Sequence, residues 1–234
     1  MPRGKPISWE ELNQLGGAGE EITVPEVRRS MELASALFRA TLLGGGVPHR
    51  KVTALTTKFR DAGRRSAPWK PTSSRVPGRP QDGLDGNRIN RWLLPEDHKF
   101  YATEVDANLV EIRYLFQTLS MHGAPSVGDG INLGAWEWLA EGAIGRGDYL
   151  DPVQLVLIDF NDFLDNPRLV TSGHYIPLNR GGRHVWRNTF LTLKISNDLQ
   201  GDNTVDELLN ILNHTVESHR RLKSWEPNST IRRE

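Results

Sequence analysis

The chain has 234 residues, of which 37% are hydrophobic, and this favours one globular domain or two small ones. It contains no cysteine, which excludes disulfides, zinc ribbons and thiol nucleophiles and leaves His, Asp, Glu and Asn as candidate metal ligands. No run of about 18 apolar residues could span a bilayer, and no signal-peptide stretch follows the basic start, so we expect a cytoplasmic protein without a membrane partner.

Charge is unevenly distributed along a chain whose formal net charge is zero. Between Arg50 and Arg91 eleven Lys or Arg residues face three Asp residues, a net charge of +8. Within this stretch, SAPWKPTSSRVPGRPQDGLDGN has neither a helical nor a strand period. Residues 50–92 are therefore predicted to be a basic arm that follows a nucleic-acid backbone, with Arg64 and Arg65 on phosphates. The alternative is a solvated linker.

Residues 1–49 and 93–167 are predicted to be helical. The SWEE capping box at Ser8 begins one helix, and apolar residues recur at helical spacing from Val24 to Gly44. Further helices are expected from about Thr103 to Met121 and, around Trp136 and Trp138, up to about Gly145. We assign both tryptophans to packing rather than to base stacking.

The segment from Asp151 to Pro167 fits two structures. Asp-Pro is a good helix start, whereas VQLVLIDF would also serve as a buried strand, and we favour the helix. The last helix is predicted from Thr204, which forms a capping box with Glu207 and precedes a broad apolar face.

Residues 171–202, TSGHYIPLNRGGRHVWRNTFLTLKISNDLQGD, are predicted to form strand, loop, strand and helix. A short strand presents His174, a turn follows at Gly181 and Gly182, and TFLTLK forms a second strand after Asn188. ISNDLQ then begins a short helix that Gly201 ends.

This segment resembles the HNH, or ββα-metal, nuclease family over residues 171–208. The family pattern of His, Ile, Pro, Leu, a Gly pair, Asn, an apolar strand and a closing His or Asn is matched by His174, Ile176, Pro177, Leu178, Gly181, Gly182, Asn188, Phe190 to Lys194, and Asn197. The predicted elements make a mainly α chain with a small embedded β-hairpin, an α+β fold, and the resemblance implies that residues 168–234 hold a ββα-metal finger with the C-terminal helix.

The resemblance also implies roles for three residues. His174 would be the general base that takes a proton from the water attacking phosphorus. Asn188 would tie the loop to the strand by side-chain to backbone hydrogen bonds and so fix the imidazole. Asn197 would offer its amide oxygen to one divalent cation, Mg²⁺ or alternatively Mn²⁺.

Gly173 departs from the commoner family form, in which an Asp or a His that binds the metal precedes the base. Substitute ligands in this chain are Asp165 or Asp162, Asp202, and His214 or His219, and no spacing rule selects among them. Basic residues around the site are candidates for phosphate contacts, although loop residues of this kind are commonly only solvated: Arg180, Arg183, His184 and Arg187.

Together these features predict a metal-dependent endonuclease that hydrolyses double-stranded DNA, of the restriction type or from a mobile element. Because one finger with one metal hydrolyses one strand, we expect a homodimer if both strands are cut. The rival interpretations are a DNA-binding protein that keeps the finger as a scaffold without its metal, and a nuclease for RNA or structured DNA. A purely structural hairpin is a third alternative, with His174 bonded to the backbone.

Overall fold

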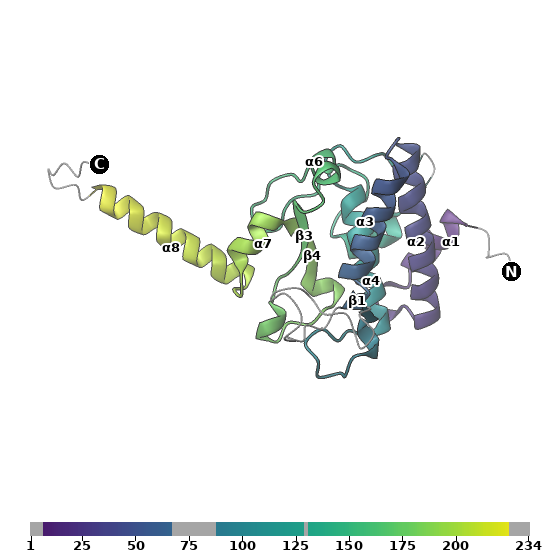
Figure 1. Cartoon of the computed structure of the whole chain (residues 1–234), viewed down its shortest axis with the longest axis horizontal. Helices are drawn as coiled ribbons and strands as arrows, with labels where there is room; N and C mark the ends of the chain where they lie inside the picture. The colour runs from purple at the N-terminus through teal and green to yellow at the C-terminus, as the bar shows by residue number, and fades with distance from the viewer. Residues whose placement is uncertain (1–6, 67–87, 129–130, 225–234) are drawn as a thin grey trace, which may run out of the picture.

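The computed structural model describes residues 7–66, 88–128 and 131–224. It is mainly helical with two small antiparallel strand pairs, an α+β fold (Figure 1). Helices α1 to α6 and both strand pairs form the body, and the last helix extends away from it. In the described part of the chain no helix is both long and apolar enough to cross a bilayer.

The N-terminal helices follow the predicted pattern. Helix α1 (Trp9–Gly16) begins where the Ser8 side chain accepts a hydrogen bond from the Glu11 backbone N–H at 3.1 Å. Helix α2 spans Val24–Gly44, as predicted, and begins with a capping box between Thr23 and Glu26.

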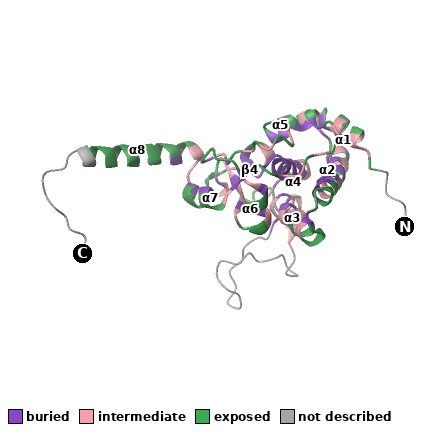
Figure 2. Cartoon of the chain, turned by 90° about the horizontal axis from the view of Figure 1, so that it is seen from above, coloured by how far each residue is buried: buried purple, intermediate pink, exposed green. Residues whose placement is uncertain are grey.

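Helix α4 (Glu104–Leu119) lies at the centre of the body and is buried on every side from Ala107 onward (Figure 2). It packs against α2, α3 and strand β4. Its buried charges have opposite partners, because Glu111 pairs with Arg64 and Arg113 pairs with Glu141. The helix predicted from Thr103 to Met121 is confirmed.

Trp136 and Trp138 are packing residues. Helix α5 (Glu137–Ala140) follows a short turn that holds Trp136, whose side chain is fully buried and donates to the Leu12 carbonyl at 2.8 Å. The two indole rings stack with centroids 6.2 Å apart. The helix ends at Ala140 rather than near Gly145, because Glu141 adopts a left-handed backbone with φ 59°.

The basic stretch is not an arm throughout. Its first part forms helix α3 (His49–Ala62), which buries Val52, Leu55 and Phe59 against the core, so the boundary expected at residue 50 is wrong. Strand β1 (Arg65–Ser66) then pairs antiparallel with β2 (Ile89–Asn90). The Pro-, Gly- and Ser-rich loop predicted between them falls on 67–87, which lie outside the described residues.

The helix favoured for Asp151 to Pro167 is also wrong over its first half. Only Phe160–Asp165 is helical, as α6. The fully buried Asp151 carboxylate accepts hydrogen bonds from the Val153 and Gln154 backbone N–H groups and, across the fold, from the Thr192 hydroxyl and the Leu193 N–H. These bonds hold the segment as a turn against the hairpin.

The predicted hairpin is formed by β3 (Val170–His174) and β4 (Thr189–Leu193), with His174 opposite Thr189. Helix α7 (Lys194–Gln200) follows β4 directly, and α8 (Val205–Ser224) comes next. The outer edge of β4 is bonded to the helical body: the Leu191 N–H donates to the Gln117 side chain at 3.0 Å, and the Tyr149 hydroxyl donates to the Leu191 carbonyl at 2.7 Å. We call β3, β4 and α7 the hairpin–helix unit.

Gly63, at the end of α3, gives a direct test of this packing. A Cβ at this position would lie 2.8 Å from the Glu111 Cβ and 2.9 Å from the Glu111 backbone nitrogen, so Gly63→Ala would force α3 away from α4. We expect the free energy of unfolding to fall by about 1–3 kcal/mol in chemical denaturation. Gly44→Ala is the control because no atom lies within 4 Å of the added Cβ; equal effects of the two changes would contradict the close contact.

Candidate active site

His174 and Asn197 lie on the wall of one cavity of about 250 Å³, which we call the His174 cavity. His174 is the last residue of β3, and Asn197 lies in the middle of α7. The buried Gln200 side chain joins the two elements, because its amide donates to the His174 backbone carbonyl at 2.7 Å. The hairpin–helix unit therefore brings together the two side chains that the sequence placed 23 residues apart.

Asn188 holds the loop between the strands in place. Its side-chain oxygen accepts from the Ile176 N–H at 2.8 Å, and its amide group donates to the carbonyls of Ile176 and Arg183, both at 2.9 Å. Gly182 approaches this loop so closely that a Cβ would lie 2.0 Å from the Ile176 carbonyl oxygen. The bonds of Asn188 thus fix the backbone just after His174.

A chain of hydrogen bonds defines the protonation state of His174. His184 Nε2 lies 2.9 Å from the Gly63 carbonyl oxygen, which can only accept, so this nitrogen carries the proton. The Nδ1 of a neutral His184 is then an acceptor, and the His174 Nε2, 3.2 Å away, donates to it. A neutral His174 consequently keeps its Nδ1 lone pair unprotonated.

Burial keeps both imidazoles neutral near pH 7. It lowers the pKa of His174 to about 4, with a further contribution from the Arg91 guanidinium. The pKa of His184 is also well below its usual value, first because of burial and then because of Arg91. His174 therefore stays a proton acceptor at neutral pH.

The position before His174 has no room for a side chain. Phe190 is the partner of Gly173 on the opposite strand, and its ring packs over the glycine. A Cβ on Gly173 would lie 2.5 Å from that ring. The packing of Phe190 therefore leaves no space for a metal-ligating side chain at position 173.

Side-chain oxygen atoms that could bind a cation in the His174 cavity belong to Asn197 and Asp202, both on its wall. Among the described residues the Asn197 amide makes no hydrogen bond, whereas the Asp202 carboxylate accepts one from Asn179 at 3.2 Å. In that same part of the chain no group of three or more His, Asp or Glu side chains could hold a metal ion by itself.

The other ligand candidates lie elsewhere. Asp165 ends α6, pairs with Lys51 at 2.8 Å and does not line the His174 cavity, so the structure does not bring it together with His174 and Asn197. Asp162 shares that short helix. His214 and His219 are exposed on α8 and also lie outside the cavity wall.

The loop residues expected on phosphate have different positions. His184 is 1% exposed and has bonds at both ring nitrogens, so a direct phosphate contact is excluded in this conformation. Arg180 pairs with Glu207 of α8, and Arg187 pairs with Glu20 while lying over the Trp186 ring. Arg183 is exposed and forms no salt bridge within the described chain, although its charge acts on the Asp106 carboxylate.

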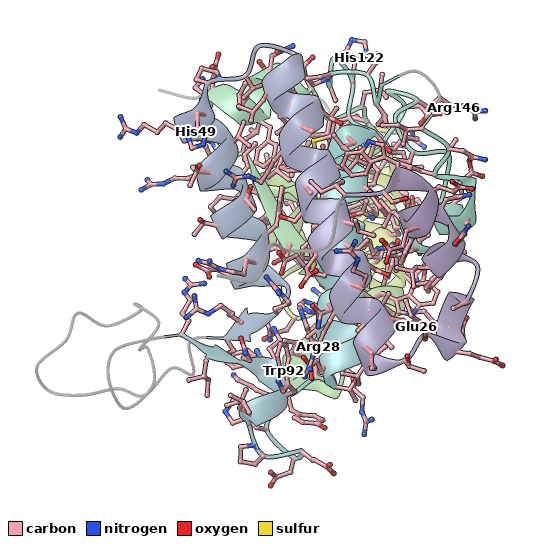
Figure 3. All side chains as sticks on the ribbon, turned by 90° about the vertical axis from the view of Figure 1, so that its right-hand side faces the viewer. Glu26, Arg28, His49, Trp92, His122 and Arg146 are labelled. Atoms are coloured by element: carbon pink, nitrogen blue, oxygen red, sulfur yellow. The ribbon has the colours of Figure 1, made fainter. Side chains whose placement is uncertain are left out.

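Arg64 and Arg65 line a second cavity, of about 890 Å³, which we call the basic cavity. It lies between α2, the end of α3 and the β1–β2 pair, and Figure 3 shows Arg28 and Trp92 from its wall at the same end of the molecule. Arg64 has a structural partner in the buried Glu111 carboxylate, whose pKa burial raises to about 7 against the opposing effect of Arg64.

Three further arginines surround one acid at the wall of the basic cavity. Arg60, Arg65 and Arg88 lie 3.5–3.7 Å from the Asp61 carboxylate, with 27–41% of their side chains exposed. We call these residues the Asp61 arginine cluster. One carboxylate cannot neutralise three guanidinium groups, so the cluster keeps a net positive charge toward solvent.

Sequence reasoning missed Arg91 and Gln200, and it missed the contact between His184 and His174. The buried Arg91 donates to the carbonyls of Gly63, Ala62 and Phe100. No spacing rule could predict these contacts, because the sequence does not distinguish Arg91 from the other basic residues between Arg50 and Arg91. His184 carries a weak signal, since it lies ten residues from His174 within one loop.

The protonation state of His174 can be tested without any substrate. In ¹⁵N spectra of histidine-labelled protein, we expect His174 to be neutral with its proton on Nε2 from pH 8 down to about pH 5, since its pKa is about 4. His184→Phe removes the acceptor, so the single Nε2-protonated form should give way to a mixture of tautomers. A His174 that titrates near pH 6.5 would contradict the assignment.

No protein-family model matches the chain, and no curated protein does. One solved structure whose backbone is similar over part of the chain is titled "Crystal structure of a type II restriction endonuclease". It shares 17% sequence identity at a TM-score of 0.44, over 57% of this chain and 62% of that one, so the present chain spans less than two thirds of its length. A likeness of this size carries no functional argument, and the chemistry of the site has to support the function.

Proposed function

We propose that this protein hydrolyses phosphodiester bonds of double-stranded DNA with a divalent metal ion, as an HNH-type endonuclease. The observation that carries the proposal is the shared wall of the His174 cavity. There an imidazole with a free Nδ1 lone pair lies beside an amide without a hydrogen bond in the described chain, at the end of a strand–strand–helix unit.

His174 is the proposed general base. Its Nδ1 takes a proton from the water that attacks phosphorus, and His184 fixes the tautomer that makes this nitrogen available. In the free protein the pKa of His174 is about 4, which makes it a weak base. A bound phosphodiester is negatively charged and favours the protonated imidazole, whereas the divalent ion proposed in the same cavity opposes it.

The ligands on the cavity wall fit a hard cation. Asn197 and Asp202 supply amide and carboxylate oxygen, the ligand types that Mg²⁺ prefers, and Mg²⁺ usually takes only one or two protein ligands and completes its shell with water and substrate phosphate. Mn²⁺ fits the same ligands. When bound, the metal would neutralise charge on the phosphate and on the leaving 3′ oxygen.

The Asp61 arginine cluster and the exposed Arg183 are the proposed DNA contacts. Arginine side chains with uncompensated charge bind phosphate oxygens without regard to sequence. The cluster is close to the site along the chain. Strand β1, which begins at Arg65, follows two residues after Gly63, and the Gly63 carbonyl accepts the hydrogen bond of His184. Arg64 is excluded from this role because it compensates Glu111.

A restriction-type or mobile-element enzyme is the biological setting that we propose. Two other functions use the same residues. A DNA-binding protein without catalysis is favoured by the packing of Phe190 over Gly173, and a nuclease for RNA or structured DNA would use the same chemistry.

The decisive experiment is cleavage of supercoiled plasmid in Mg²⁺, in Mn²⁺ and in EDTA. We expect metal-dependent nicked or linear product from the wild type, and a rate lower by about 10²- to 10⁴-fold for His174→Ala, because a general base contributes that factor. Asn197→Ala should also lose activity, and extra metal should restore part of it.

His214→Ala is the matched control, because this exposed histidine lies outside the His174 cavity. Its cleavage rate should equal that of the wild type. DNA binding without cleavage in any metal would replace the enzyme by the binding protein, and cleavage of RNA alone would change the substrate.

Neutralising the Asp61 arginine cluster should weaken DNA binding for every sequence. For Arg65→Gln with Arg88→Gln, we expect the slope of log K against log salt to become shallower by about 2, because each phosphate contact contributes about 0.9. Fluorescence anisotropy over a salt series measures the slope.

Two comparisons make this binding test specific. Arg50→Gln with Arg168→Gln removes the same charge from positions that do not line the basic cavity, and it should leave the slope nearly unchanged. Arg64→Gln should instead lower thermal stability, because it leaves a buried carboxylate without its partner. Equal slopes for both double variants would show that the Asp61 arginine cluster does not contact DNA.

A further inference from the structure

Helix α8 presents an uncovered apolar face. It extends away from the body after packing against α7 near its start (Figure 1), and it is exposed along almost its whole length (Figure 2). Five large apolar side chains on it are 40–63% exposed: Leu209, Ile211, Leu212, Val216 and Leu222. A single amphipathic helix in water gains little from its own hydrogen bonds and needs a packing partner.

Three of these five side chains, those of Leu209, Leu212 and Val216, follow the spacing of a coiled coil. Val205, Leu209, Leu212, Val216 and His219 succeed one another at intervals of four and three residues, which is the seam of a heptad repeat. Leu208 and Leu222 lie along one flank of this seam. The face therefore fits a second helix of similar length.

The other flank of the seam carries charges of opposite sign at its two ends. Asp206, Asn213 and Arg220 are seven residues apart, so they occupy the same heptad position. Asp206 and Arg220 are both exposed, and neither forms an ion pair with another described residue. The flank is acidic where α8 begins and basic toward its other end.

We propose that α8 joins two copies of this chain into a homodimer by antiparallel pairing. An antiparallel pair brings the same flank of both helices together, so Asp206 of each copy meets Arg220 of the other and the two Asn213 residues meet at the centre. In the same register Leu212 packs against Val216 of the second copy. Every contact occurs twice, as a two-fold interface requires.

A parallel pair does not fit the same residues. It would set the charged flank of one helix against the apolar flank of the other, which carries Leu208 and Leu222, and Asp206 would meet no basic residue. The charges thus select both the partner and the direction. The inference does not rest on the proposed nuclease function, because it concerns assembly alone.

The first test is the mass of the full chain in solution, by sedimentation velocity over a range of concentrations. We expect a dimer for the wild type. Leu212→Glu with Val216→Glu should give a monomer, because it places four carboxylates in the seam of the pair. Asn210→Glu with His214→Glu adds the same groups on the opposite side of α8 and should remain dimeric.

The second test determines the direction of pairing and leaves the apolar residues of the seam unchanged. Asp206→Arg, or Arg220→Asp, should raise the dimer dissociation constant about 5- to 30-fold, since each change turns two attractive contacts into repulsive ones. The double change Asp206→Arg with Arg220→Asp should restore wild-type affinity. In an equimolar mixture of the two single variants, the mixed dimer should form in preference to either homodimer, since both of its contacts join an arginine to an aspartate whereas each homodimer has two like-charge contacts.

Three outcomes would overturn the proposal. These are a monomeric wild type at all concentrations, a dimer that survives the changes at Leu212 and Val216, and a double charge reversal that fails to restore affinity. Circular dichroism of each variant separates a lost interface from a lost helix. A dimer without plasmid cleavage would leave this inference intact and remove the proposed function.

Discussion

One backbone carbonyl, that of Gly63, connects the candidate active site to the helical body. It accepts from Arg91 Nε at 2.8 Å and from His184 Nε2 at 2.9 Å. It can do so because Gly63 has no Cβ and lies directly against the backbone of α4 at Glu111. The oxygen sets the tautomer of His184 and, through it, that of His174. Arg91, which it helps to hold, also places the positive charge that disfavours protonation of both rings.

The local parts of the fold could be predicted from the sequence, and the long-range parts could not. The capping residues and apolar period of α2, the hairpin and α7 all depend on contacts between residues close in the chain. Asn188 accepts a hydrogen bond from Ile176, twelve residues away, and both residues belong to the motif, so this contact could be predicted from the sequence. The contact between His184 and Gly63 spans 121 residues, and no local pattern reports it.

Two errors of the sequence analysis share a physical cause. In α3 the basic residues of the outer face hid the spacing of Val52, Leu55 and Phe59, which are buried. At Asp151 a residue that commonly begins a helix uses its carboxylate to join two distant segments. In both places tertiary contacts decided between local alternatives that propensity left open. The basic stretch also offers fewer free charges than its composition suggests, because Arg64 and Arg91 are used inside the fold.

The outer edge of β4 shows how closely the hairpin–helix unit depends on the rest of the fold. A two-stranded hairpin normally has open edges, but Leu191 exchanges its outward hydrogen bonds with Gln117 of α4 and with Tyr149. The unit is therefore no interchangeable cassette, since residues 170–200 moved onto another scaffold would arrive with unpaired backbone groups and without the carbonyl that orients His184. A transplanted unit would keep the position of His184 only if the helical body were carried along with it, so the hairpin and the helices around it form one structural piece.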